Sequence, residues 1–227
     1  MLSRKFLIGQ GECCGNGCYM CPYKPKHQKG STEVNKKKTL IVCALEQETE
    51  GQLEDYDVIY TGVGKINATF HLHSKIGEIY NSYQELPKLI INYGTAGSRE
   101  LPIGELVDCT GFIQRDMSVT ALGFDKGRTP FEEDVPLVLE STREVKFNPI
   151  GKHYICGSGD NFVEDIKNEI DYIDVFDMEA YALAKVCYHY HVPFISFKYI
   201  TDNVNEQSSK DWEENCSDGI KKFKEII

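Results

Sequence analysis

The sequence predicts an α/β fold in which strands and helices alternate around a largely parallel sheet. Short apolar runs, such as residues 39–45 and 88–93, have the length and the branched side chains of buried strands. A longer stretch with helical periodicity, residues 66–83, lies between these two runs. Strands that alternate with helices typically pair in parallel, because each helix returns the chain to the starting edge of the sheet.

The same reasoning assigns the remaining elements in order. Strands are expected at the apolar runs 39–45, 57–61, 88–93, 105–112, 153–156, 174–177 and 193–200. Helices are expected at 46–53, 66–83, 162–170, 178–190 and 209–226. On the last of these helices, Trp212 is expected to be a packing residue.

The chain is predicted to have two parts. Residues 1–37 are rich in cysteine, glycine and lysine and hold few branched aliphatic side chains. The basic run 24–38, with Pro25 and Gly30, has the composition of a linker. We therefore expect a short cysteine-rich segment at 1–37 and a larger domain at 38–227, which a chain of 227 residues can accommodate.

Charge and composition exclude several classes of function. The formal net charge of -10 disfavours binding to nucleic acid or to anionic membranes, which requires a basic surface. No apolar run is long enough to span a bilayer, and the apolar stretch at the N-terminus is too short for a signal peptide. Several cysteines lie within apolar runs, as buried thiols do in a reducing compartment, so a cytoplasmic protein is expected.

Four of the nine cysteines lie close together near the N-terminus. Cys13, Cys14, Cys18 and Cys21 could supply the four thiolates of a tetrahedral zinc site or of an iron–sulfur cluster. The alternative is a reduced tail without fixed structure. The spacing of the last three cysteines also matches that of radical S-adenosylmethionine enzymes, but a short motif without its expected domain is weak evidence.

Carboxylates and glycines follow the predicted strands at matching places. Glu48 follows the first strand, Glu179 follows the strand at 174–177, and Asp202 follows the last strand. Glycine-rich turns are expected at 62–64 and 94–97. Because ligands of α/β proteins bind at the carboxyl ends of the strands, these groups are expected to face one crevice.

Residues 39–227 resemble the 5′-methylthioadenosine/S-adenosylhomocysteine nucleosidases, within the purine nucleoside phosphorylase superfamily. The resemblance is carried by the stretches 44–48 (ALEQE), 61–68 (TGVGKINA), 91–97 (INYGTAG), 158–162 (SGDNF) and 177–180 (DMEA). Shorter similarities follow at 119–124, 192–194 and 201–202. The resemblance implies a three-layer sandwich with a central mixed sheet, and a homodimer that hydrolyses the N-glycosidic bond of a 5′-modified adenine nucleoside without a cofactor.

The resemblance also implies roles for individual residues. Glu48 would activate the attacking water, Asp202 would protonate the purine, and Glu179 would accept hydrogen bonds from a ribose hydroxyl. Such chemistry needs an acid that is still protonated at neutral pH, so burial should raise the pKa of Asp202. The substrate-binding residues would be Val63, Thr95, Ala96, Gly97, Phe162, Val163 and Met178. Leu122 and Pro130 would reach the 5′ pocket of the partner subunit.

Two other functions remain open at this stage. A phosphorylase would need basic groups for its phosphate, and Arg99 and Arg115 are the candidates. Arg115 could instead meet a 5′-phosphate, which would make the substrate a nucleotide. A non-catalytic nucleoside sensor is the other alternative. The sequence departs from the family at Lys198, where arginine is usual, at Leu122, where an aromatic residue is usual, and at Thr95, where serine is usual.

Overall fold

The computed structural model describes residues 4–18, 21, 23–24, 27–34, 39–54, 56–141 and 145–227. Residues 25–26 and 35–38 of the expected linker therefore lie outside the described residues. The strands are β1 Tyr23–Lys24, β2 Glu33–Val34, β3 Thr39–Cys43, β4 Val58–Tyr60, β5 Leu89–Ser98, β6 Leu106–Gln114, β7 Leu139–Glu140, β8 Tyr154–Ser158, β9 Val175–Asp177 and β10 Phe194–Asp202. The helices are α1 Arg4–Gly9, α2 Lys65–Tyr83, α3 Ala180–Tyr190, α4 Ser208–Asn215 and α5 Ile220–Ile226, with 3₁₀ turns at η1 Glu46–Glu48 and η2 Thr120–Leu122.

One 8-stranded mixed sheet forms the centre of the larger part of the chain. Its strands follow the order β10-β6-β8-β9-β5-β3-β4, and β7 pairs with β6. The pair β5 and β10 is parallel, as are β3 and β5, whereas β6 runs antiparallel to β10. The additional pairing of β10 with β5 closes the strands β10, β6, β8, β9 and β5 into a ring. The predicted α/β fold with a central mixed sheet is confirmed.

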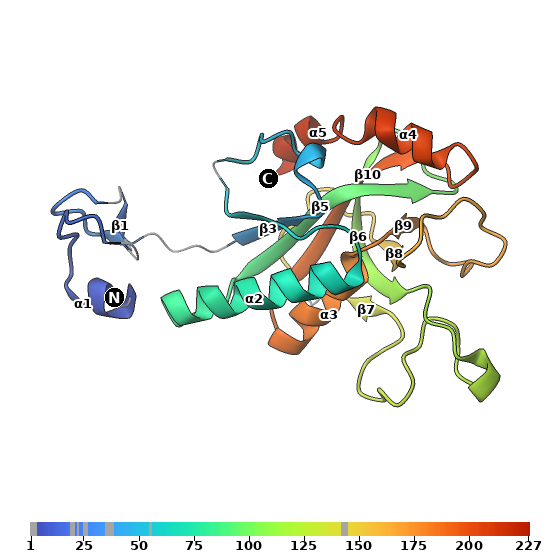
Figure 1. Ribbon diagram of the computed structural model, residues 1–227, viewed down its shortest axis with the longest axis horizontal. Coiled ribbons are helices and arrows are strands. Elements are labelled where there is room, and N and C mark those ends of the chain that lie inside the picture. The colour runs from blue at the N-terminus through green and yellow to red at the C-terminus, as the bar shows by residue number, and fades with distance from the viewer. Residues whose placement is uncertain are drawn as a thin grey trace.

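Helices cover both faces of this sheet (Figure 1). On one face, α2 and α3 bury apolar side chains such as Leu72 and Leu183 against the strands. On the other face, Phe223 of α5 stacks on Tyr93 of β5, with 4.4 Å between the ring centroids. Burial of these two apolar surfaces is the main force that holds the helices on the sheet.

Two predicted elements have different lengths in the structure. The glycine-rich segment 94–97 is not a turn but the second half of β5, because β10 pairs with it along its length. The predicted terminal helix is divided into α4 and α5. The division lies near Gly219, where a Cβ atom would be 2.4 Å from Cγ of Tyr199, so only glycine fits against that ring.

Two predicted helices are wrong. Residues 162–170 form turns rather than a helix. The guanidinium group of Arg115 holds this loop, since it donates to the Asn161 side chain at 3.2 Å and to Glu169 at 3.0 Å. The predicted helix at 46–53 is reduced to the 3₁₀ turn η1, in which Glu48 turns inward and is buried.

The cysteine-rich segment has a small structure of its own, shown in blue in Figure 1. β1 and β2 pair in antiparallel register, and the hydroxyl of Tyr23 donates to the Leu7 carbonyl at 2.9 Å. Cys13, Cys21 and Tyr23 form a buried cluster. Within the part of the chain that the structure describes, no helix is long and apolar enough to cross a membrane.

Candidate active site

A cavity of about 350 Å³ lies where the carboxyl ends of β3, β5 and β10 meet β9 and the start of α3. Because β3, β5 and β10 run parallel, their last residues and the residues that follow them lie at this one edge of the sheet. The cavity is lined by the three predicted carboxylates Glu48, Glu179 and Asp202, and by Val63, Thr95, Ala96, Gly97, Phe162, Val163 and Met178. The structure thus brings these residues together around one space, while their individual roles stay predictions.

Glu48 is held in a fixed orientation although it lies in a short turn. It is only 3% exposed. Its Oε1 accepts hydrogen bonds from the backbone N–H and from the hydroxyl of Thr95, both at 2.9 Å. Its Oε2 accepts from the Leu45 N–H at 3.0 Å. Gly94 allows this approach, since a Cβ there would be 3.2 Å from Glu48 Oε1.

Trp212 belongs to the site, which sequence reasoning missed. Its indole N–H donates to the hydroxyl of Thr95 at 2.9 Å, and its side chain lines the cavity. Thr95 in turn donates to Glu48, so α4 is connected to the carboxylate through one hydroxyl group. The prediction that Trp212 only packs on the terminal helix is therefore wrong. No sequence signal pointed to this contact, because the two residues are 117 positions apart.

Asp202 ends β10 and lies against the backbone of β5. Its Oδ1 accepts from the Val204 N–H at 3.0 Å, and its Oδ2 accepts from the Thr201 hydroxyl at 3.1 Å. A Cβ at Gly97 would lie 2.6 Å from Oδ1, so glycine is required for the carboxyl group to occupy this place. Burial raises the pKa of Asp202 and outweighs the hydrogen bonds from Ser208, Val204 and Thr201, which lower it.

Glu179 precedes α3 and is 7% exposed. Its Oε1 accepts a hydrogen bond from the Gly64 N–H at 2.8 Å. Gly64 has a φ of 94°, a conformation that only glycine adopts without strain. Burial, followed by the charge of Asp177, raises the pKa of Glu179 from 4.5 to about 8. A proton on this carboxyl group is therefore stable at neutral pH.

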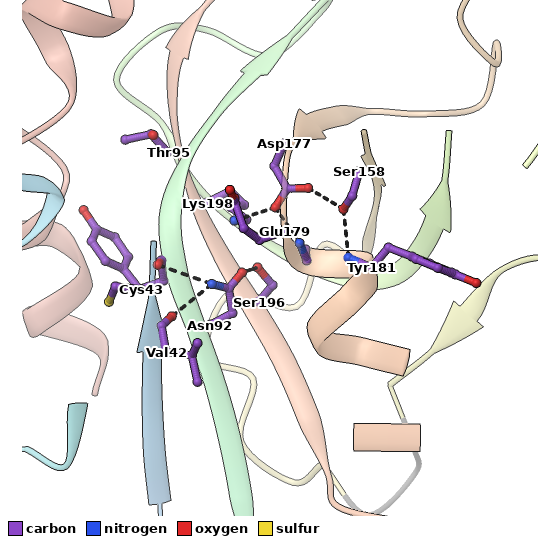
Figure 2. Close-up of polar contacts among 12 residues, drawn as sticks. Val42, Cys43, Asn92, Thr95, Ser158, Asp177, Glu179, Tyr181, Ser196 and Lys198 are labelled. Atoms are coloured by element: carbon purple, nitrogen blue, oxygen red, sulfur yellow. Dashed lines mark hydrogen bonds and ion pairs between the residues drawn. The ribbon is translucent and has the colours of Figure 1, made fainter. Parts of the chain in front are cut away.

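A buried ion pair lies behind Glu179, as Figure 2 shows. Lys198 Nζ is 2.8 Å from Asp177 Oδ2, and the two side chains are 2% and 1% exposed. Asp177 also accepts from the Ser158 hydroxyl at 2.5 Å and from the Ala180 N–H at 2.9 Å. Burial alone would raise the pKa of Asp177, but Lys198 and these donors bring it below its ordinary value. Ser158 and Asp177 lie in stretches that carry the family resemblance, yet sequence reasoning gave them no role.

Two predicted substrate-binding residues lie elsewhere. Leu122 and Pro130 do not line the cavity, and Leu122 is 70% exposed on the 3₁₀ turn η2. Both were expected to act across a dimer interface, so their role stays a prediction.

The two arginines considered for phosphate are engaged with protein groups. Arg115 lines the cavity but is 1% exposed, and it donates to Glu169 and to the Asn161 carbonyl. Arg99 lies over the ring of Phe176, 5.5 Å from its centroid, and is not part of the cavity lining.

The four N-terminal cysteines lie outside this cavity. Cys13 and Cys21 form one pair with 3.6 Å between their sulfur atoms, and Cys14 and Cys18 form a second pair at 3.4 Å. In the described residues, no three His, Cys, Asp or Glu side chains are arranged so that they could hold a metal ion. The predicted metal site is therefore not formed in this arrangement of the side chains.

Comparison with known proteins defines the class of this chain. The family model described as Phosphorylase superfamily matches residues 49–227. The chain belongs to the phosphorylase superfamily, a family of nucleosidases and phosphorylases. A named relative is the 5′-methylthioadenosine/S-adenosylhomocysteine nucleosidase of Staphylococcus haemolyticus, 30% identical over 196 residues, which are 78% of this chain and 82% of the relative.

Solved structures share the fold. One is a mutant of the 5′-methylthioadenosine/S-adenosylhomocysteine nucleosidase (MTAN) of Helicobacter pylori with 5′-methylthioadenosine in the active site. It superposes with a TM-score of 0.70 at 20% identity, over 85% of this chain and 98% of that chain. A futalosine hydrolase mutant from Helicobacter pylori gives a TM-score of 0.70 at 19% identity, over 84% and 98% of the two chains. The predicted superfamily and sandwich fold are confirmed, and the identity of the substrate is a separate question.

Proposed function

We propose that this protein hydrolyses the N-glycosidic bond of a 5′-modified adenine nucleoside and releases adenine. The substrate class comprises methylthioadenosine, S-adenosylhomocysteine and 5′-deoxyadenosine. The observation that carries the proposal is the arrangement of Glu48, Glu179 and Asp202 around one cavity, each with a different set of partners. The named nucleosidase relatives support the same substrate class.

Asp202 would be the general acid. Cleavage of an N-glycosidic bond leaves electrons on the purine, so a proton delivered to the ring makes it a better leaving group. The raised pKa of Asp202 favours the protonated form that this step needs. Phe162 would stack on the purine and the Val163 backbone would bind its edge, which would place the ring near this carboxyl group.

Glu48 would take the proton from the attacking water. A base must hold its lone pair toward the water, and the hydrogen bonds from Thr95 and Leu45 fix the orientation of this carboxylate. The bond from Trp212 to Thr95 orients the hydroxyl that donates to Glu48. An acid and a base on opposite sides of the bond are the arrangement that inverting glycosidases use.

Glu179 would bind the ribose hydroxyls, with Met178 beside the sugar. The transition state of this reaction carries positive charge on the sugar, and a carboxylate nearby stabilises that charge. A hydroxyl hydrogen bond favours the ionised form of Glu179, so binding of the sugar would lower the high pKa that the free site gives this group.

Water rather than phosphate is the proposed nucleophile. A phosphorylase binds a phosphate dianion with cationic groups, and a carboxylate at the position of Glu48 repels such an ion. Arg115 is engaged by Asn161 and Glu169, and Arg99 lies outside the cavity. The same contacts speak against recognition of a 5′-phosphate by Arg115.

We also propose that the active form is a cytoplasmic homodimer. Large apolar side chains at the start of α2 and in the loop 119–131 are exposed, with Ile66 at 81%, Phe70 at 64% and Phe131 at 87%. Leu122 and Pro130 lie in the same loop, from which they would complete the 5′ pocket of the second copy. We expect Phe70→Asp to yield monomers in size-exclusion chromatography with light scattering, whereas Tyr80→Asp, farther along α2, should leave the dimer intact. A monomeric parent chain would contradict this part of the proposal.

The central test is adenine release from methylthioadenosine by the purified chain, with and without phosphate. Equal release in both conditions is expected. Asp202→Asn should lose this activity and keep its circular dichroism spectrum, whereas Asp218→Asn, a change at an exposed carboxylate, should keep both. Release only with phosphate would establish a phosphorylase, and failure on a panel of purine nucleosides and nucleotides would favour a non-catalytic sensor.

A further inference from the structure

The four N-terminal thiols line one small cavity between α1 and β1. Cys13, Cys14, Cys18 and Cys21 all border it. The sulfur separations within the two pairs are 3.6 Å and 3.4 Å. In a tetrahedral zinc site with metal–sulfur bonds of about 2.3 Å, neighbouring sulfur atoms are about 3.8 Å apart. Each pair therefore already has nearly the separation of two ligands of one metal ion.

The backbone around these thiols is held by hydrogen bonds that do not depend on the sulfur atoms. The Cys13 N–H donates to the Ser31 carbonyl at 2.8 Å, and the Gly30 N–H donates to the Cys13 carbonyl at 2.9 Å. The Cys21 N–H donates to the Cys18 carbonyl at 2.9 Å, which closes a tight turn. The His27 N–H donates to Cys21 Sγ at 3.5 Å, as backbone amides do toward metal-bound sulfur.

Among the residues that the structure describes, this segment buries only a small apolar cluster. Its buried cluster consists of Cys13, Cys21 and Tyr23, with Cys18 beside it and Leu7 nearby. Units of this size are usually stabilised by disulfides or by a structural metal. Two of the four cysteines have no place in an apolar core, because Cys14 is exposed and Cys18 is half-buried.

We propose that Cys13, Cys14, Cys18 and Cys21 bind a single zinc-class divalent ion in a four-thiolate site that stabilises the N-terminal segment. Because the described side chains do not yet converge on one point, binding would move the Cys14–Cys18 pair onto the buried Cys13–Cys21 pair. Each thiol would lose its proton to solvent as it coordinates the ion. The sulfur separations of 3.6 Å and 3.4 Å fit pairs of ligands on one ion, which favours a single ion over a cluster of iron and sulfide atoms.

The proposed ion has a structural role and takes no part in the reaction. The thiols lie in a separate cavity from Glu48, Glu179 and Asp202. Metal binding that is coupled to folding contributes its free energy to the segment that it folds. This inference therefore stands independently of the proposed nucleosidase activity.

The test measures metal in the full chain, purified under reducing conditions. We expect one zinc ion per chain by elemental analysis, and a cobalt–thiolate absorption band when Co²⁺ replaces it. Cys18→Ser should lose the zinc and the band, whereas Cys216→Ser, a change in the larger domain, should keep both. After the metal is removed, protease should cleave the N-terminal segment faster, and added Zn²⁺ should restore its protection while residues 39–227 stay intact.

Three results would overturn the proposal. A reduced chain that holds no metal and gives no cobalt band has no such site. Iron and sulfide in a chain purified without oxygen would establish a cluster in place of a single ion. The mass of a chain with two disulfides, retained in the presence of physiological thiols, would assign the four cysteines to covalent pairs.

Discussion

Replacement of Lys198 by methionine should be one of the most destabilising single changes in the protein. The ammonium group is 2.8 Å from Asp177, and both side chains are almost fully buried. Removal of one partner leaves the Asp177 carboxylate buried without a compensating charge, which costs about 3–5 kcal/mol of unfolding free energy. For a chain of this length, that corresponds to a fall in Tm of roughly 6–20 °C.

Urea unfolding curves measure this effect, and a double variant tests its cause. Asp177→Asn combined with Lys198→Met removes both charges. An asparagine oxygen can still accept from the Ala180 N–H, and its amide can donate to Ser158. The double variant should therefore be more stable than Lys198→Met alone. A single variant within about 1 kcal/mol of the parent chain, or a double variant with no recovery, would refute the reasoning.

Three further predictions concern the cavity. Asp202→Asn should keep the fold but lower kcat about 10²–10⁴-fold, the usual contribution of a general acid, and a near-normal rate would remove Asp202 from the mechanism. Trp212→Phe keeps an aromatic ring but loses the donor to Thr95, so kcat should fall about five- to tenfold and Tm by about 2–4 °C, since one hydrogen bond contributes about 1 kcal/mol. Burial and Asp177 raise the pKa of Glu179 from 4.5 to about 8, so the folded state binds this proton more tightly than the unfolded chain. The resulting stability is fully present below pH 4.5 and is lost as the pH rises to about 8, and urea unfolding of Glu179→Gln across this range should lack that decline.

The arrangement of the carboxylates was predictable because it follows from topology. Glu48 and Asp202 lie at the carboxyl ends of β3 and β10, and both strands run parallel to β5. Parallel strands end at one edge, so residues far apart in sequence meet there without any sequence signal of contact. The apolar runs that predict the strands therefore also predict the meeting of these side chains.

The features that sequence reasoning missed depend on tertiary contacts. Residues 94–97 have the composition of a turn, but pairing with β10 keeps them extended. The indole of Trp212 on α4 donates to Thr95 of β5, and the terminal segment is broken near Gly219, where Tyr199 leaves no room for a side chain. The pairing of β5 with β10 and the hydrogen bond from Trp212 to Thr95 both join residues about 100 positions apart. Local sequence patterns carry no information about such contacts.

The three carboxylates are alike in chemistry but differ in their donors, and this difference divides the proposed roles among them. Glu48 accepts three hydrogen bonds, two of them from Thr95 and one from Leu45, and they fix the orientation of the carboxylate that would face the water. Glu179 accepts a single backbone hydrogen bond, and burial together with the negative charge of Asp177 raises its pKa to about 8, so hydroxyl donors of a bound sugar would favour its ionised form. Asp202 is buried enough that its pKa rises despite hydrogen bonds from Ser208, Val204 and Thr201, which suits the proposed role of a group that gives a proton away.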